Sequence, residues 1–111
     1  DGFIQSGFAV LGRFEEPGLL VLVSLAGGEK HGYAMMQDIE ETCGARIGPG
    51  TLYAVLARLE GRGWIEALPA SERRKPYRLT AAGALVLAEQ LSGMQDLAAA
   101  GLRRLRLAGT P

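Results

Sequence analysis

The sequence has few of the residues from which enzymes, metal sites and disulfide-rich proteins are built. Its 111 residues include one cysteine and one histidine, so an internal disulfide is impossible and a His/Cys metal cluster is not expected. It contains neither a GxSxG motif nor a glycine-rich phosphate loop that ends in Lys-Ser or Lys-Thr. We therefore expect a protein that is not an enzyme and that uses no metal and no cofactor.

Long apolar runs and a net charge are also absent. No stretch of 18 apolar residues is free of charge, and the N-terminus lacks the basic, apolar and small-residue order of a secretory signal. These absences predict a soluble, cytoplasmic protein that has no membrane partner. Twelve Lys and Arg balance 12 Asp and Glu, which by itself disfavours a nucleic-acid partner, because phosphate binding needs clustered cations.

The charges are, however, unevenly distributed along the chain. Residues 1–57 carry seven acids against three bases, whereas residues 58–111 carry nine bases against five acids. Four of these bases lie close together in the sequence, at Arg73, Arg74, Lys75 and Arg78. A basic surface is thus expected on a protein that is neutral overall.

Two helices are predicted in the first half of the chain. Pro17 suits a first helical position and Gly27-Gly28 a helix end, so the apolar residues between them are expected to form a helix buried nearly all round. A second helix is predicted over residues 32–43. Its apolar positions, spaced by three or four, are Tyr33, Met36, Ile39 and Cys43. Cys43 is thus expected to be a small core residue, with a redox or nucleophilic role as the alternative.

A third helix and a β-hairpin are predicted next. Pro49 suits the start of this helix, which ends before Gly61 and Gly63. Its apolar stripe consists of Leu52, Val55, Leu56 and Leu59. Residues 64–68 and 76–80 are predicted to be two strands, and the polar, charged loop between them gives the hairpin a basic tip.

The last part of the chain is predicted to be one long helix. Thr80 suits its N-cap, and a bend is expected near Ser92-Gly93 because glycine weakens a helix. Apolar residues recur in this helix with the spacing of a heptad seam, at Leu87, Leu91, Met94, Ala98, Leu102 and Leu105. Such a seam needs a partner, so we expect these residues to form a dimer contact.

The pattern divides the chain into three parts. Residues 1–16 are an N-terminal arm, which is either a helix that packs on a partner subunit or in part a segment added for expression. Residues 17–80 are expected to form a winged-helix DNA-binding domain, and residues 81–111 a dimerisation helix. The predicted fold is mainly α with a small β-hairpin: a winged helix-turn-helix of three helices and a wing, followed by a long C-terminal helix.

Three segments resemble the N-terminal domain of the PadR-like family of transcription regulators. They are LVSLAGGEKHGYAMMQDIEE, IGPGTLYAVLARLEGRGWIE and RRKPYRLTAAG, and the resemblance extends over roughly residues 17–85. The chain departs from the family pattern at Ala54, where proline is frequent, and at Pro76, where an aromatic residue is common. The resemblance implies a sequence-specific DNA-binding regulator, a repressor rather than an activator, which a small aromatic or hydrophobic effector releases in some members. The seam of the last helix predicts a homodimer, and its two-fold symmetry in turn predicts an inverted-repeat operator.

Two groups of residues are candidates for contact with double-stranded DNA. The outer face of the third helix, which would enter the major groove, comprises Gly50, Thr51, Ala54 and Arg58. Small residues permit close approach, while Thr51 and Arg58 can bond a phosphate or a base edge. The second group is the flexible, basic loop of the wing, with Arg73, Arg74 and Lys75. The alternative for this loop is a solvated run of charge.

For four further side chains, the sequence is compatible with either a structural or a functional role. Tyr33 either packs at the start of the second helix or contacts a phosphate. Tyr53 either packs on the second helix or contacts the DNA backbone, and the resemblance supports the backbone contact. His31 is expected at the start of the second helix, since a metal site would need further ligands near it. Trp64 either packs in the core or an interface, or forms the wall of an effector pocket.

A winged helix that binds only protein is the main alternative function. Zero net charge favours this alternative, because a protein-binding module needs no attraction to phosphates. The wing sequence Arg73-Arg74-Lys75 favours DNA instead. The salt dependence of binding distinguishes these two functions, because added salt weakens binding to DNA steeply.

Overall fold

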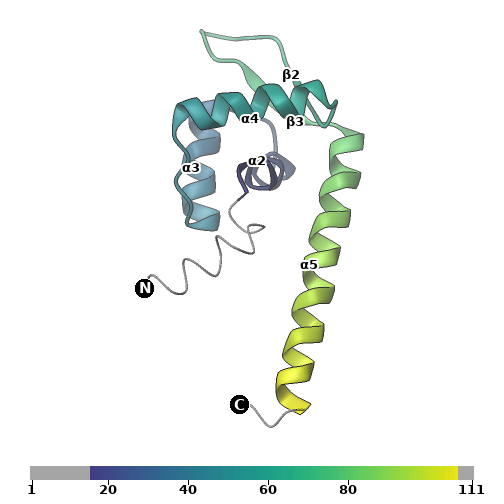
Figure 1. Cartoon of the computed structure of the whole chain (residues 1–111). Coiled ribbons are helices and arrows are strands. Elements are labelled where there is room, and N and C mark those ends of the chain that lie inside the picture. Colours follow the sequence, from purple (N-terminus) through teal and green to yellow (C-terminus); the bar gives the residue numbers. More distant parts are fainter. Residues whose placement is uncertain (1–15, 108–111) are drawn as a thin grey trace.

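The computed structural model describes residues 16–107, which form four helices and three short strands (Figure 1). In chain order these are α2 (Pro17–Ala26), β1 (Lys30–His31), α3 (Gly32–Cys43), α4 (Pro49–Gly61), β2 (Ile65–Ala67), β3 (Pro76–Leu79) and α5 (Ala81–Leu107). The expected N-terminal arm, residues 1–16, lies almost wholly outside the described residues. Within residues 16–107, no helix is long and apolar enough to cross a membrane. The predicted winged helix-turn-helix with a long C-terminal helix is confirmed.

Helix α2 is the centre of the fold. Seven of its ten residues are buried, and Val21 has no exposed surface, as the uninterrupted apolar run predicts. Helices α3, α4 and α5 all pack on α2. From these neighbours the core receives Met35, Ile39, Leu52, Val55, Leu56, Leu59 and Leu87. Because each buried side chain of this size contributes about 1.5–3 kcal/mol, this shared core fixes how the three helices are placed.

Helix α3 has the predicted bounds, but only part of its predicted inner face is buried. It ends at Gly44, whose φ of 71° is the left-handed conformation that favours glycine. Met35 and Ile39 are buried, whereas Tyr33 is 60% exposed and Cys43 is exposed. The expected core position of Cys43 is therefore wrong. The side of α3 that carries Met35 and Ile39 is buried because α2 covers it. Tyr33 and Cys43 lie on a neighbouring side of the helix that α2 does not cover.

The sheet has three antiparallel strands in the order β1-β3-β2. The predicted hairpin is β2–β3, in which Ile65 pairs with Leu79, and both strands are slightly shorter than predicted. Strand β1 was not predicted, because its two residues are too few to show a period of two. It pairs Lys30 with Tyr77 and so attaches the segment before α3 to the wing.

Helix α5 begins in direct contact with the backbone of the hairpin. The Thr80 hydroxyl accepts a hydrogen bond from the Gly83 N–H (3.0 Å) and donates one to the Gly63 carbonyl (2.7 Å), which confirms the predicted N-cap. A Cβ atom at Gly83 would overlap the Trp64 carbonyl group. Only glycine therefore fits at this point. The helix then continues through Gly93 without interruption, so the expected bend does not break it (Figure 1).

We expect Gly83→Ala to lower the free energy of unfolding by about 1–3 kcal/mol, because the methyl group forces α5 away from Trp64. Gly93→Ala is the matched control: a Cβ there meets nothing within 4 Å, so helix propensity should raise stability by about 0.5–1 kcal/mol. Thermal unfolding followed by circular dichroism measures both changes. Equal melting temperatures for the two variants would contradict the close contact.

Candidate nucleic-acid interface

A cavity of about 240 Å³ lies where α3, α4 and the wing meet. We call it the wing cavity, and it is lined by His31, Gly32, Tyr33, Tyr53, Arg73, Arg74, Lys75 and Tyr77. Five of these residues are among the predicted DNA contacts, and they come from three separate parts of the chain. The lining contains three cationic side chains and no carboxylate. The cavity therefore suits an anion with several acceptor oxygens.

The backbone at the tip of the wing is a tight turn. Ser71 and Arg74 exchange two backbone hydrogen bonds of 2.8 and 2.9 Å, and the two residues between them have positive φ angles, 51° at Glu72 and 69° at Arg73. Positive φ at both central positions is characteristic of a type I′ turn, although glycine is the usual residue there. The basic loop was expected to be flexible, whereas its tip has this regular turn geometry.

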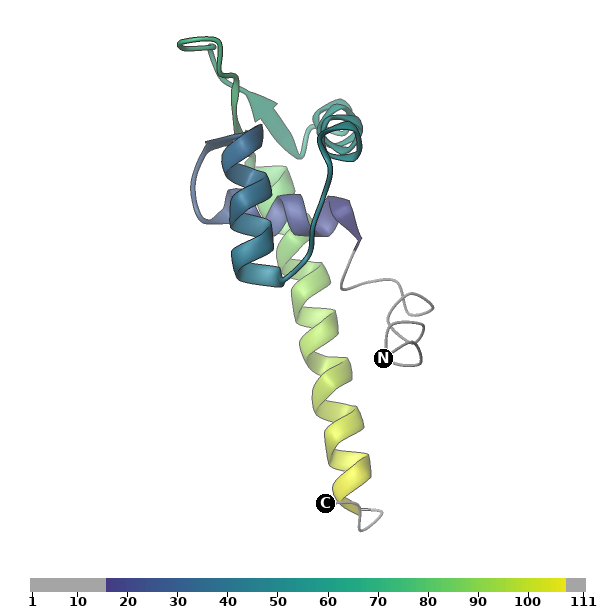
Figure 2. The same ribbon diagram turned by 90° about the vertical axis from the view of Figure 1, so that its left-hand side faces the viewer.

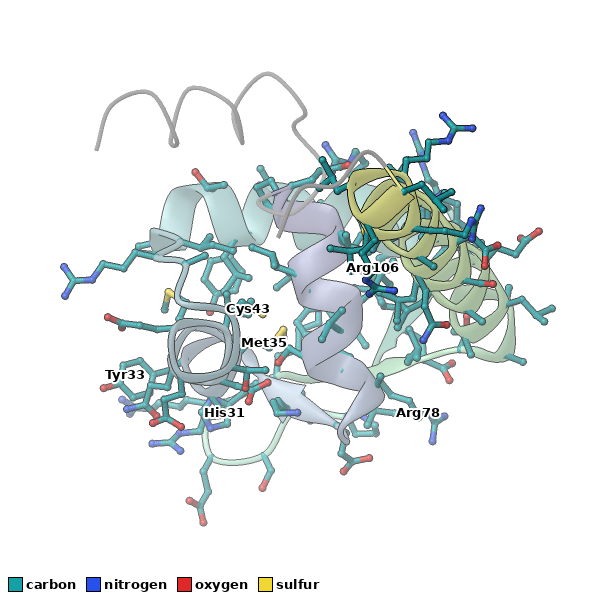
Figure 3. All side chains as sticks on the ribbon, turned by 90° about the horizontal axis from the view of Figure 1, so that it is seen from below. His31, Tyr33, Met35, Cys43, Arg78 and Arg106 are labelled. Atoms are coloured by element: carbon teal, nitrogen blue, oxygen red, sulfur yellow. The ribbon has the colours of Figure 1, made fainter. Side chains whose placement is uncertain are left out.

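Two of the wing cations contact other side chains that line the wing cavity. Arg74 Nη1 lies 3.1 Å from His31 Nε2, and the Lys75 ammonium lies 5.6 Å from the centre of the Tyr77 ring. Arg78, the fourth base of the cluster, is instead paired with Glu66 at 2.7 Å on the β2–β3 pair. Figure 3 shows His31 beside Tyr33 and Arg78 well away from both. The wing thus presents three of its four bases to the cavity.

The two tyrosines of the wing cavity are both largely exposed. Tyr33 has 60% and Tyr53 52% of its surface accessible. The Tyr53 hydroxyl lies over Gly32, where an added Cβ would come within 2.5 Å of it. Tyr53 therefore packs on the first residue of α3 and still presents half of its surface to solvent. Packing on α3 thus leaves Tyr53 accessible for a contact with the DNA backbone. Tyr33 is not packed away and has its hydroxyl within 3.4 Å of Gln37 Nε2.

The outer face of α4 carries small side chains. Gly50, Thr51 and Ala54 are exposed, as predicted, and Ala57 and Gly61 are exposed on the same face. The last two were missed, although the helical period that buries Leu52, Val55, Leu56 and Leu59 indicates them. Arg58 is exposed too, but its Nη2 would lie 3.0 Å from a Cβ at Gly18, so its guanidinium points toward the start of α2. The structure does not bring Arg58 together with the wing cations.

A second cavity, of about 340 Å³, lies at the other end of α4. We call it the Trp64 cavity. Its lining comes from α2, α4, α5 and the residue just before β2, and includes Arg58, Arg62, Trp64, Val86 and Gln90. Trp64 is half-buried against the core, and the Arg62 guanidinium lies 5.0 Å from the centre of its ring. Trp64 therefore packs on the core and also forms a wall of a cavity.

The predicted seam of α5 begins in the core and continues into solvent. Leu87 is buried and Met94 is partly buried, so this part of the seam belongs to the domain itself. The rest of the seam is exposed and comprises Leu91, Ala98, Leu102 and Leu105. Figure 1 shows this part of α5 extending beyond the other helices.

A cluster of polar side chains holds the segment before α3 in place. Asp38 accepts hydrogen bonds from Ser24 Oγ (2.6 Å) and Thr42 Oγ1 (3.1 Å), and the Lys30 ammonium lies 3.9 Å away. Lys30 also donates to the Ser24 and Gly28 carbonyls. The hydrogen bond from Ser24 is the main reason that the pKa of Asp38 lies below its ordinary value. The cluster ties α2, β1 and α3 together and thereby positions His31.

Comparison with known proteins identifies the family. The model of the PadR-like family of transcriptional regulators matches residues 21–89, which is more than half of the chain. The chain belongs to the PadR-like family of transcriptional regulators. The members of this family are transcriptional regulators, which are generally not enzymes.

Individual proteins and a solved structure are also similar to this chain. A transcriptional regulator of Mycobacterium tuberculosis is 35% identical over 83 residues, which cover 72% of this chain and 77% of that protein. An uncharacterised transposon protein of Streptomyces fradiae is 41% identical over 85 residues, 77% of this chain, but the match spans only 25% of its length. A PadR-family regulator of Clostridium difficile has the same fold, with a TM-score of 0.71 at 22% identity over 80% of this chain and 97% of that one.

The lowered pKa of Asp38 predicts how acid affects this PadR-like chain. Since the folded pKa is below the unfolded value of about 3.9, the cluster stabilises the fold above that pH, and the contribution is lost as the pH falls through the folded pKa. Asp38→Asn should lower stability at pH 7 by about 1 kcal/mol and weaken the decline below about pH 4. Urea unfolding between neutral and strongly acidic pH measures this, with Asp96→Asn on α5 as control. Parallel pH profiles for Asp38→Asn and wild type would contradict the role of the carboxylate.

Proposed function

We propose that this protein is a cytoplasmic, homodimeric repressor that binds an inverted-repeat operator, with α4 in the major groove and the wing cavity on the phosphate backbone. The observation that carries the proposal is the lining of the wing cavity, which brings three wing cations and two exposed tyrosines to the start of α3. The start of a helix adds unpaired N–H groups and a positive dipole end, both of which favour a phosphate.

The face of α4 suits a close approach to DNA. Its exposed residues Gly50, Ala54 and Ala57 have no long side chains, so the helix backbone can come near the base edges. Thr51, in the first turn, supplies a hydroxyl that can bond a phosphate or a base. Repression needs no further part, because a dimer that occupies an operator excludes other proteins from the same DNA.

The dimer is proposed from the exposed part of the α5 seam. Leu91 is 42%, Leu102 53% and Leu105 51% exposed, and all three share one side of α5 with the buried Leu87. A second copy of α5 would cover these side chains and continue the core beyond the domain. A two-fold dimer presents two α4 helices, so its operator is expected to be an inverted repeat with half-sites about 10 bp, or a multiple of that, apart.

The Trp64 cavity is the proposed site of a small aromatic or hydrophobic effector. Its volume of about 340 Å³ is at the lower end of the range of ligand pockets, and Trp64, Leu19 and Leu22 supply apolar surface. It lies between α4 and α5, so a ligand there contacts both the helix proposed to read DNA and the helix proposed to pair. Filling the cavity would change how the two α4 helices of a dimer are spaced.

The first test concerns the dimer. Light scattering of the wild-type protein at micromolar concentration should give twice 11.8 kDa. Leu91→Glu with Leu105→Glu should abolish the dimer, because each buried leucine contributes about 1.5–3 kcal/mol and a buried unpaired charge is costly. The matched control is Leu85→Glu with Leu107→Glu, which places the same charges on exposed positions away from the seam. A monomeric wild type, or a control that dissociates equally, would count against this interface.

The second test concerns DNA. Replacing Arg73, Arg74 and Lys75 with alanine should weaken binding to random duplex DNA and reduce the slope of log affinity against log salt by about one for each phosphate that the variant no longer neutralises. The control replaces Arg103, Arg104 and Arg106 on the last turns of α5, which removes the same charge far from the wing cavity. Fluorescence anisotropy at several salt concentrations measures both. If the folded wing variant keeps the affinity and slope of wild type, the protein-binding alternative is favoured.

A further inference from the structure

His31 has two competing contacts at the edge of the wing cavity. It is the N-cap of α3, where its Nδ1 accepts a hydrogen bond from the Ala34 N–H at 3.3 Å. Its other ring nitrogen, Nε2, lies 3.1 Å from Arg74 Nη1 on the wing. The side chain thus connects the start of a core helix with a residue 43 positions later in the chain.

One neutral imidazole ring cannot accept both of these hydrogen bonds. A neutral ring carries one N–H and one nitrogen with a free lone pair, and both the Ala34 amide and the Arg74 guanidinium are donors. With the proton on Nε2 the ring caps α3 but turns its N–H toward the arginine. With the proton on Nδ1 it accepts from Arg74 but leaves the Ala34 amide without its cap. A doubly protonated ring would accept neither hydrogen bond.

The groups around His31 indicate which ligand would allow the ring to satisfy both of its nitrogens. From the wing it faces Arg73, Arg74 and Lys75, and the tyrosines of the cavity contribute neutral hydroxyls. The carboxylate of Asp38, on the same helix, is already engaged with Ser24, Thr42 and Lys30. An anion with more than one acceptor oxygen would resolve the conflict, because it can bind Arg74 in place of the ring and also accept a hydrogen bond from the Nε2–H. A phosphate of duplex DNA has this chemistry.

We propose that His31 is a tautomeric switch in phosphate binding: a DNA phosphate in the wing cavity takes Arg74 from the ring and fixes His31 with its proton on Nε2. In that form Nδ1 caps α3 and the Nε2–H donates to the phosphate. His31 is then a direct, uncharged DNA contact, and phosphate binding strengthens the cap of α3. The inference rests on the DNA binding proposed above.

Two substitutions separate the cap from the phosphate contact. His31→Ser keeps a side-chain oxygen that caps a helix well but is too short to reach the cavity, whereas His31→Ala removes both functions. We expect His31→Ser to keep the melting temperature of wild type and to bind random duplex DNA at least about tenfold more weakly. The salt slope should stay that of wild type, because a neutral ring displaces no counterion, while Arg74→Ala should reduce it by about one.

The tautomer can be observed directly, because His31 is the only histidine. A long-range ¹H–¹⁵N spectrum therefore shows one imidazole, and on addition of duplex DNA it should show Nε2 protonated and Nδ1 unprotonated. A doubly protonated ring in the complex, or a tautomer mixture that DNA does not change, would overturn the inference. So would a folded His31→Ser variant that binds as tightly as wild type. Failure of the wild-type protein itself to bind DNA is a separate result, which would overturn the proposed function as well.

Discussion

The burial of α2 is the constraint on which the rest of the structure depends. A helix that is apolar on nearly every side must be covered by several neighbours, and here α3, α4 and α5 cover it. Ser24, the only buried polar side chain among residues 16–107, bonds to Asp38 and so ties α3 to this core. The start of α3, α4 and the wing thereby lie on the same side of the domain (Figure 2). Residues from these three parts line the wing cavity.

Local pairing of charges, and not the net charge, decides which surface can attract DNA. Several carboxylates away from the wing cavity are engaged with nearby groups: Glu66 with Arg78, Glu40 with Arg46, and Asp38 with Lys30. The three cations of the wing cavity face no carboxylate in its lining. Since salt screens exposed charges beyond about 10 Å, the distant acids of a neutral protein do little to cancel this local positive potential.

Helix α4 connects the two cavities. Tyr53 in its first turns lines the wing cavity, and Arg58 in its last turn lines the Trp64 cavity beside α5. The close contact of Gly83 with the Trp64 backbone fixes where α5 begins relative to this end of α4. The proposed effector site thus lies between α5 and the end of α4, while the first turns of the same helix α4 carry part of the proposed DNA surface.

The sequence by itself determined the bounds of the helices, the hairpin and the seam of α5. Pro17, Pro49 and Gly44 act through neighbouring residues, so their effects can be predicted locally. The candidate DNA contacts of the wing followed from the same kind of signal. Only the tertiary structure decided which face of α3 is buried, where Arg58 points, and that His31 meets Arg74. Each of these depends on a partner far away in the chain, 43 residues away for His31, and no local pattern specifies such a partner.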